Sequence, residues 1–339
     1  MRPSFSIIFF TVLSGAGYGL WFLLGLGLVV HWRACSPLQP AAGSGITLAL
    51  CGYPGVIDYG LAAGFILVSA GLISSLAHLG QPQRAWRALS QWRSSWLSRE
   101  GVASIVAYAP ATALIFIAGV TVLNPSTNIL RWLGWMRPLG GVLAIAAAVT
   151  VFCTAHIYSS LKPIRAWHNR YVVPGYLMFG LYGGGLCLWA LATLPGAWRT
   201  RETPALLTGI IVVAASCALL KYAYWRHIDR DQAPSAGHAT GLGTLGSVSS
   251  FEQPHTEENY LTHEMGFVLA RKHSRKLRAI VLVAGFLIPA LFAALGLALP
   301  VARVAAAWLA LAAGMLGIFV ERWLFFADAK HAVMAYYGR

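Results

Sequence analysis

The sequence predicts an all-α fold, a polytopic membrane protein built as an eight-transmembrane-helix bundle. Of its 339 residues, 58% are hydrophobic, and the mean hydropathy is +0.64. A soluble domain of this size needs far more polar surface than such a composition provides. In addition, eight separate windows reach the roughly 20 apolar residues that a helix needs to cross a bilayer.

The eight windows follow one another along the chain, so we expect residues 1–339 to form a single integral membrane domain. They cover residues 7–30, 59–79, 102–123, 139–158, 174–194, 204–224, 279–299 and 301–327. The first window is too long for a signal peptide and lacks a clear small-residue cleavage site, so we expect it to be retained. Pro300 alone separates the last two windows, which predicts a very tight connection.

The basic residues gather on one side of the predicted bundle. Eight spans place both termini on one side, together with the connections after the second, fourth and sixth spans. We call this side A and the opposite side B. Side A holds 19 of the 25 lysines and arginines, and such an excess marks cytoplasmic loops. We therefore expect a multi-pass protein of the bacterial inner (cytoplasmic) membrane with both termini in the cytoplasm.

The cysteines and the one long loop leave alternatives open. The five cysteines form no C-x-x-C pair, so the sequence shows no recognisable spacing for an iron–sulfur or zinc site. Cys35 and Cys51 share the first side-B loop, where they could form a disulfide or stay as free thiols. The loop 225–276 has a middle rich in Gly, Ser and Thr. It is expected to be either a flexible tether or a surface that orders against partner subunits.

A dense polar and aromatic segment, residues 75–101, joins the second and third spans on side A. Charged residues are only 11% of the chain, yet this segment holds four arginines, a histidine and a glutamate. His78 ends one span and Glu100 opens the next, so the two should lie at similar depth. A histidine and a carboxylate can form a proton-transfer pair, which suits a quinone in an apolar cleft. The alternative is that His78 caps one helix and Glu100 stabilises the N-terminus of the other.

Other polar residues are also expected near side A. Each even-numbered span ends near a histidine, among them His156, and the last span carries Glu321 and Arg322. On this placement alone, His156, Tyr158 and Arg322 are further candidates for the quinone pocket. Haem held between His78 and His156 is a competing interpretation, although both lie at helix ends. A transporter is another, but mid-span charges are nearly absent.

A short pattern occurs twice on side A. His78 is followed by PQRAW, which ends at Trp86, and His156 is followed by PIRAW, which ends at Trp167. Repeated helix pairs are common in membrane folds. Two matches this short can also arise by chance.

Three stretches resemble the DmsC-type membrane anchors of dimethyl-sulfoxide-reductase-like molybdoenzymes. They are MRPSFSIIFFTVLSGAGYGL, HLGQPQRAWRALSQWRSSWLSREG and ERWLFFADAKH, and the similarity runs essentially from end to end. The resemblance implies eight transmembrane helices, no haem, and a quinone site beside a docked four-cluster iron–sulfur subunit. That subunit would connect the anchor to a molybdopterin catalytic subunit. Iron–sulfur clusters and molybdopterin would then belong to the partner subunits only.

The same resemblance implies roles for residues of the 75–101 segment. The histidine and glutamate of the family's quinol site match His78 and Glu100, the two catalytic candidates. We expect His78 to hydrogen-bond a quinone carbonyl and Glu100 to relay protons to the cytoplasm. Gly80 would allow close approach, Arg84 would orient the pocket or dock the cluster subunit, and Trp86 would pack against the ring.

The predicted orientation bears on the substrate. The best-known members of the family carry their catalytic subunits in the periplasm, whereas side A is predicted to be cytoplasmic here. Residues 241–278 also resemble the anchors of cytoplasm-facing sulfite dehydrogenases. The favoured reaction is therefore sulfite oxidation coupled to reduction of ubiquinone or menaquinone. The alternatives are an anchor of a dimethyl sulfoxide or other oxyanion reductase that oxidises menaquinol, and a passive anchor without a redox role.

Overall fold

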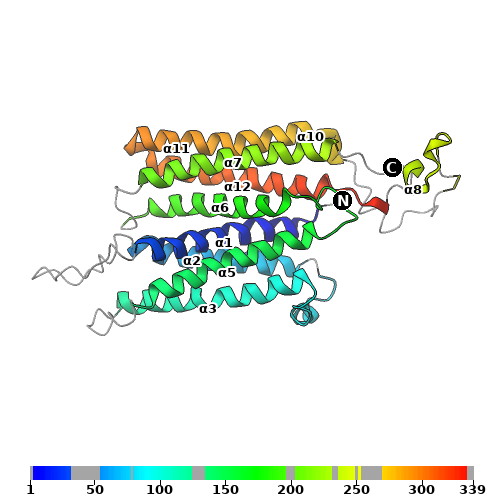
Figure 1. Ribbon diagram of the computed structural model, residues 1–339. Coiled ribbons are helices and arrows are strands. Elements are labelled where there is room, and N and C mark those ends of the chain that lie inside the picture. Colours follow the sequence, from blue (N-terminus) through cyan, green and yellow to red (C-terminus); the bar gives the residue numbers. More distant parts are fainter. Residues whose placement is uncertain are drawn as a thin grey trace, which may run out of the picture.

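The computed structural model describes residues 3–31, 54–77, 79–123, 134–195, 203–230, 236–248, 251–252 and 269–333. Eight helices in this part of the chain are long and apolar enough to cross a membrane (Figure 1), which confirms the predicted fold class. They are α1 (Phe5–His31), α2 (Pro54–Leu76), α3 (Trp96–Leu123), α5 (Met136–Ser159), α6 (Val172–Ala192), α7 (Thr203–Arg230), a composite seventh helix, and α12 (Arg303–Ala327). The seventh runs through α10 (Leu269–Ile280), a π-helical segment η4 (Val281–Leu287) and α11 (Ile288–Ala298).

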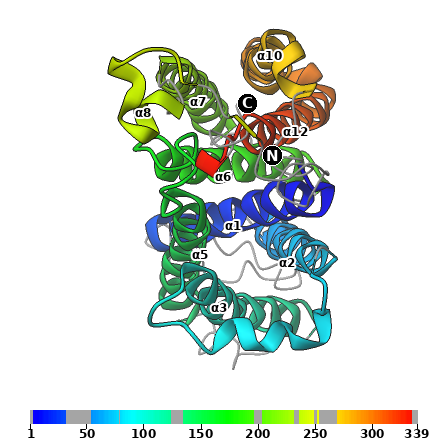
Figure 2. The same ribbon diagram turned by 90° about the vertical axis from the view of Figure 1, so that its right-hand side faces the viewer.

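The helices pack as two groups of four. The first group is α1, α2, α3 and α5, and the second is α6, α7, the α10–α11 helix and α12. The first helix is central, because it packs against α2 and α5 of its own group and against α6 of the other. Figure 2, which looks at side A, shows α1 between these neighbours. Groups on α1 can therefore contact both halves of the bundle.

Glycines bring α1 and α6 into backbone contact. A Cβ atom on Gly19 would overlap the carbonyl group of Gly180, and one on Gly184 would overlap the backbone of Gly19 and Leu20. Such small residues allow close helix crossings in membranes, where packing rather than hydrophobic burial drives association. The two halves therefore meet with almost no side-chain layer at this crossing.

An ion network joins three elements of the second half on side A. Arg278 of α10 donates to Asp229 near the end of α7 at 2.6 Å and to Asp328, just after α12, at 3.3 Å. Burial raises the pKa of Asp328, and the Arg278 guanidinium opposes that rise. The network ties the side-A ends of these helices together.

Several boundaries differ from the expected ones. The third span begins at Trp96, six residues before its apolar window, and therefore includes Glu100. The predicted loop 225–276 is helical at both ends, since α7 reaches Arg230 and α10 starts at Leu269. Between them lie the short α8 (Ala236–Thr240) and η3 (Leu242–Thr244). The last two spans are joined by the 3-10 turn η5 (Pro300–Ala302), as tight as predicted. Cys35 and Cys51 lie outside the described residues.

Candidate functional site

The segment after α2 lies on the surface of side A. His78 lies outside the described residues. Gly80 is exposed, and a Cβ atom placed on it would meet nothing within 4 Å. Arg84 and Trp86 belong to the 3-10 helix η2 (Pro82–Leu89), where the Trp86 side chain is 66% exposed. Of the predicted site residues in this segment, the three that the structure describes, Gly80, Arg84 and Trp86, are therefore exposed.

Glu100 is instead buried in the second turn of α3, with 5% of its surface exposed. The hydroxyl of Thr154, on α5, is hydrogen-bonded to a carboxyl oxygen of Glu100 and also lies 3.0 Å from the carbonyl oxygen of Thr150. A hydroxyl has one hydrogen, and a carbonyl oxygen only accepts. Both contacts are satisfied when Glu100 is protonated and donates to Thr154, which donates to Thr150.

The cost of burying a charge also favours the protonated state of Glu100. The ion pairs found in the described part of the chain involve Glu321, Asp229 and Asp328 and do not include Glu100. An ionised carboxylate without a partner is costly within a membrane span. The arrangement therefore suits a group that holds a proton and can release it.

His156 lies on the same α3–α5 contact as Glu100. Its Nδ1 atom is 3.0 Å from the carbonyl oxygen of Phe152 and donates to it, which leaves Nε2 as the ring nitrogen outside this contact. The ring centroid is 4.4 Å from that of Trp96 and 4.1 Å from that of Phe152. The structure thus places Glu100 and His156 on the same pair of helices, where Glu100 contacts Thr154 and His156 contacts the Trp96 ring.

Tyr158 and Arg322 form a second cluster around Tyr176 of α6. The Tyr158 ring stacks on the Tyr176 ring at 5.6 Å, and the guanidinium carbon of Arg322 lies 4.3 Å over that same ring. Glu321 pairs with Arg322 at 2.5 Å and with Lys221 of α7 at 2.5 Å. All three charged residues are buried.

Three polar residues of these clusters were missed by sequence reasoning, namely Lys221, Thr154 and Tyr176. Lys221 gave a signal, because it is a lysine inside the apolar window 204–224 and intramembrane charges are functional candidates. Thr154 and Tyr176 gave none, since their importance depends on how the helices pack.

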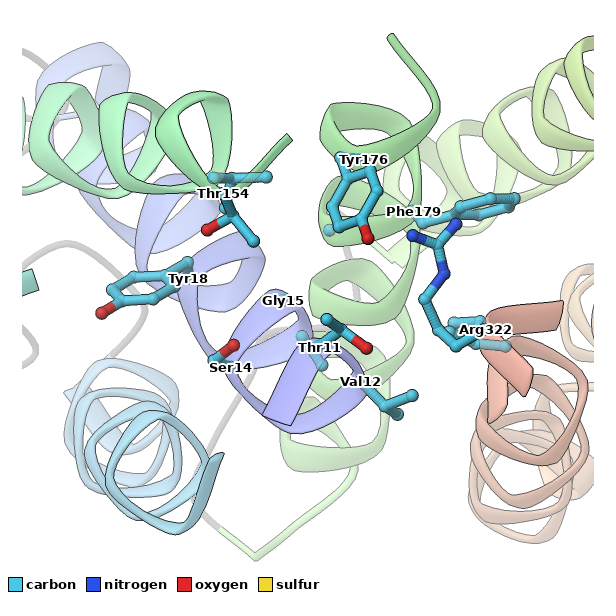
Figure 3. Close-up of a pocket in the computed structure, with 13 residues that line it drawn as sticks. Thr11, Val12, Ser14, Gly15, Tyr18, Thr154, Tyr176, Phe179 and Arg322 are labelled. Atoms are coloured by element: carbon cyan, nitrogen blue, oxygen red, sulfur yellow. The ribbon is translucent and has the colours of Figure 1, made fainter. Parts of the chain in front are cut away.

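A cavity with several hydroxyl groups on its lining lies between the two clusters, bordered by residues of α1, α5, α6 and α12 (Figure 3). The Tyr176 hydroxyl and the Arg322 guanidinium point toward each other there, and Thr154 lines the opposite wall. The cavity volume is ≈ 20 Å³. A water needs roughly 10–15 Å³ by this measure, whereas pockets for organic ligands span about 300–1,000 Å³. The cavity is therefore of a size to hold water and too small for a quinone head group.

The eight apolar helices define a multi-pass membrane protein. Its buried ionisable groups lie near side A. The chain belongs to the DMSO reductase anchor subunit (DmsC) family, whose model matches residues 1–326. This match confirms the family expected from the sequence and makes the chain a membrane anchor subunit of a DMSO-reductase-like oxidoreductase complex.

Individual relatives carry two different activities in their names. A sulfite dehydrogenase subunit of Allochromatium vinosum is 30% identical, over 99% of this chain and 99% of the relative. An anaerobic dimethyl sulfoxide reductase subunit of Escherichia coli is 25% identical, over 54% of this chain and 62% of the relative. A second such protein of the same organism, YnfH, is 26% identical, over 45% of this chain and 50% of the relative. No solved structure gives a match.

Proposed function

We propose that the chain is the quinone-reactive anchor of an iron–sulfur molybdoenzyme complex. It passes electrons between a docked four-cluster iron–sulfur subunit and the quinone pool, and a molybdopterin subunit carries out the substrate chemistry. The observation that carries the proposal is Glu100, a buried carboxyl group within a span that meets a hydroxyl and no cation among the described residues. The two-electron reduction of a quinone to a quinol takes up two protons, and the reverse reaction releases them, so its site needs such a group.

The proposed quinone site lies at the side-A end of α3 and α5. A quinone offers two carbonyl oxygens and an apolar ring. Glu100 supplies a proton carrier, His156 an imidazole nitrogen and Trp96 an aromatic face. His78 is proposed to hydrogen-bond a carbonyl of the quinone. The chain needs no haem for this role.

The surface residues of η2 complete the site through the partner. Arg84 and Trp86 are exposed in this chain, and the end of η2 lies against the start of α3, where a Cβ atom on Gly101 would be 2.8 Å from Leu89. An iron–sulfur subunit docked on side A would cover them and form the second wall of the pocket. Gly80 then leaves room for this approach. Tyr158 and Arg322 remain secondary candidates, because they belong to the Tyr176 cluster.

Sulfite is the favoured substrate of the complex. The relative that matches over nearly the full length is named a sulfite dehydrogenase subunit, whereas the dimethyl sulfoxide reductase relatives match about half of the chain. The basic side A supports a complex that faces the cytoplasm. The alternative is an anchor of a dimethyl sulfoxide or other oxyanion reductase that oxidises menaquinol.

The test is a Glu100→Gln variant of the purified complex, compared with wild type for sulfite-dependent reduction of quinone and of an artificial dye. Glutamine keeps the size of the side chain but cannot release a proton, so quinone reduction should fall by roughly 100-fold or more. Dye reduction should be unchanged, because the partner subunits accept electrons from sulfite without the anchor.

Three results would contradict parts of this proposal. Quinone reduction at the wild-type rate in Glu100→Gln would favour the passive anchor. Loss of dye activity together with quinone activity would indicate a structural role for Glu100. A wild-type complex that is inert to sulfite but oxidises menaquinol with dimethyl sulfoxide would establish the alternative reaction.

A further inference from the structure

The cavity between the two halves of the bundle has the size of a water site and carries hydroxyl groups on its lining. The Tyr176 hydroxyl is buried, makes no hydrogen bond of standard geometry with the described residues, and points into the cavity. Thr11 and Ser14 also line the cavity, and in the described part of the chain their hydroxyls donate to carbonyls of their own helix. Each of them keeps lone pairs that can accept a hydrogen bond. Buried waters take about three such partners.

Thr154 connects this cavity to Glu100. It lines the cavity and is hydrogen-bonded to the Glu100 carboxyl group. Its hydroxyl is turned toward the side of Tyr18 and away from Tyr176 (Figure 3). A molecule in the cavity is therefore needed to join the two sides, because the hydroxyls of Thr154 and Tyr176 do not meet directly.

Glu100 itself has little access to bulk water, since only 5% of its surface is exposed. A group that changes protonation in every turnover must exchange its proton with another donor or acceptor. In the described part of the chain, Thr154 is hydrogen-bonded to the Glu100 carboxyl group and also lines the cavity.

We propose that the cavity holds ordered water and that Glu100 exchanges its proton with this water through the hydroxyl of Thr154. The inference rests on the proposed role of Glu100 in quinone turnover. In the outward step, the Thr154 hydroxyl turns its hydrogen from the Thr150 carbonyl to the water. Glu100 then gives its proton to the Thr154 oxygen while Thr154 gives its own hydrogen to the water. The reverse step restores the protonated carboxyl group. No electrons move in either direction.

Tyr176 and Arg322 act as positioning residues for the water. Glu321 fixes the Arg322 guanidinium at 2.5 Å, and the Arg322 side chain packs over the Tyr176 ring. Arg322 thereby holds the Tyr176 ring in place, and the Tyr176 hydroxyl points into the cavity. The second half of the bundle thus supports proton exchange at a site on the first half.

The experiment compares Thr154→Val with Thr154→Ser in the intact complex. Valine keeps the shape but removes the hydroxyl, whereas serine keeps the hydroxyl. We expect Thr154→Val to lower the maximal rate of quinone reduction roughly tenfold or more, with a larger solvent deuterium isotope effect and an unchanged KM for quinone. Thr154→Ser should retain most of the rate. In infrared difference spectra, the carbonyl band of protonated Glu100 should shift in Thr154→Val and stay near its wild-type position in Thr154→Ser.

Tyr176→Phe gives a second test that does not depend on how well Thr154→Val assembles. Its control is Tyr182→Phe, which removes a buried hydroxyl that donates to the Gly285 carbonyl and does not line the cavity. The proposal expects a raised isotope effect in Tyr176→Phe and not in Tyr182→Phe. Equal rates in Thr154→Val and wild type, equal impairment in Thr154→Val and Thr154→Ser, or identical isotope effects in the two tyrosine variants would overturn it. If Glu100→Gln is inactive with quinone while Thr154→Val is not, only this inference fails, and the proposed function stands.

Discussion

Two cations share one carboxylate within the second half of the bundle. The Glu321 carboxylate pairs with Lys221 through one oxygen and with Arg322 through the other, each at 2.5 Å. The ammonium group of Lys221 also lies 3.9 Å from the centroid of the Tyr224 ring. Breaking a buried ion pair costs most when it leaves a charge without compensation. The loss of stability on substitution therefore depends on which of the three charged residues is replaced.

We predict that Glu321→Gln destabilises the anchor more than Lys221→Met does. Glu321→Gln leaves two adjacent cations and should lower the free energy of unfolding by roughly 3–5 kcal/mol. Lys221→Met leaves a neutral Arg322–Glu321 pair and should cost less. Thermal unfolding of both variants in detergent measures the order, and a larger loss in Lys221→Met would contradict the prediction.

At the scale of single residues, the sequence singles out some members of the candidate site and not others. Glu100 and Arg322 could be found because ionisable residues near membrane-spanning windows are rare and easily noticed. The partners Thr154 and Tyr176 could not, since threonine and tyrosine are ordinary in such helices and only helix packing selects them. The predicted roles of Gly80, Arg84 and Trp86 stay predictions, because they depend on a surface that a second subunit would supply.

The repeated short pattern leads to two different environments. In the second copy, Trp167 is buried, donates its indole N–H to the Phe325 carbonyl at 2.9 Å and stacks on the Phe325 ring. The backbone of this copy also accepts a hydrogen bond from Tyr224 at Ala166. In the first copy, Trp86 is exposed and contacts Arg87. Phe325, near the end of α12, therefore covers the tryptophan of the second copy. No described residue covers Trp86 in the first copy in the same way.

We predict that removing Trp167 affects stability, whereas removing Trp86 affects binding of the partner subunit. Trp167→Ala should destabilise the anchor by roughly 3–5 kcal/mol, because it removes a large buried ring and a buried hydrogen bond. Trp86→Ala should change stability by no more than about 0.5 kcal/mol but should reduce the amount of iron–sulfur subunit that co-purifies. Thermal unfolding and subunit stoichiometry give the two readouts. A Trp86→Ala variant that unfolds early but binds its partner normally would reverse this interpretation.

At the scale of elements, the number and order of spans were predictable, and their ends were not. Hydropathy marks the lipid-facing length of a helix, but α3 and α7 extend beyond it as helices with polar residues. The extension of α3 places Glu100 inside the helix and toward α5, which no window of hydropathy could show.

For the whole molecule, orientation is the property with the widest consequence. The excess of basic residues on side A predicts that this side faces the cytoplasm. A reporter enzyme that is active only outside the cytoplasm should be inactive when fused after Arg339 and active when inserted between residues 124 and 133 on side B. The opposite result would place the partner subunits in the periplasm and weaken the argument for sulfite.

The eight-span architecture was predictable from the sequence because each span satisfies its own backbone hydrogen bonds and needs only length and apolarity. The division into two groups of four was not, since it depends on which glycines face each other. Gly19 and Gly180 are two among 35 glycines, and nothing in their sequence context sets them apart.

That glycine crossing also restricts how lipophilic molecules can enter the protein from the bilayer. A gap between two helices usually opens when side chains rotate, but α1 and α6 touch through their backbones at Gly19 and Gly180. Opening a passage there would require the two helices to separate as rigid bodies. A molecule with a long isoprenoid tail would therefore have to enter elsewhere, at an edge of one half of the bundle, and the crossing would act as a fixed wall behind it.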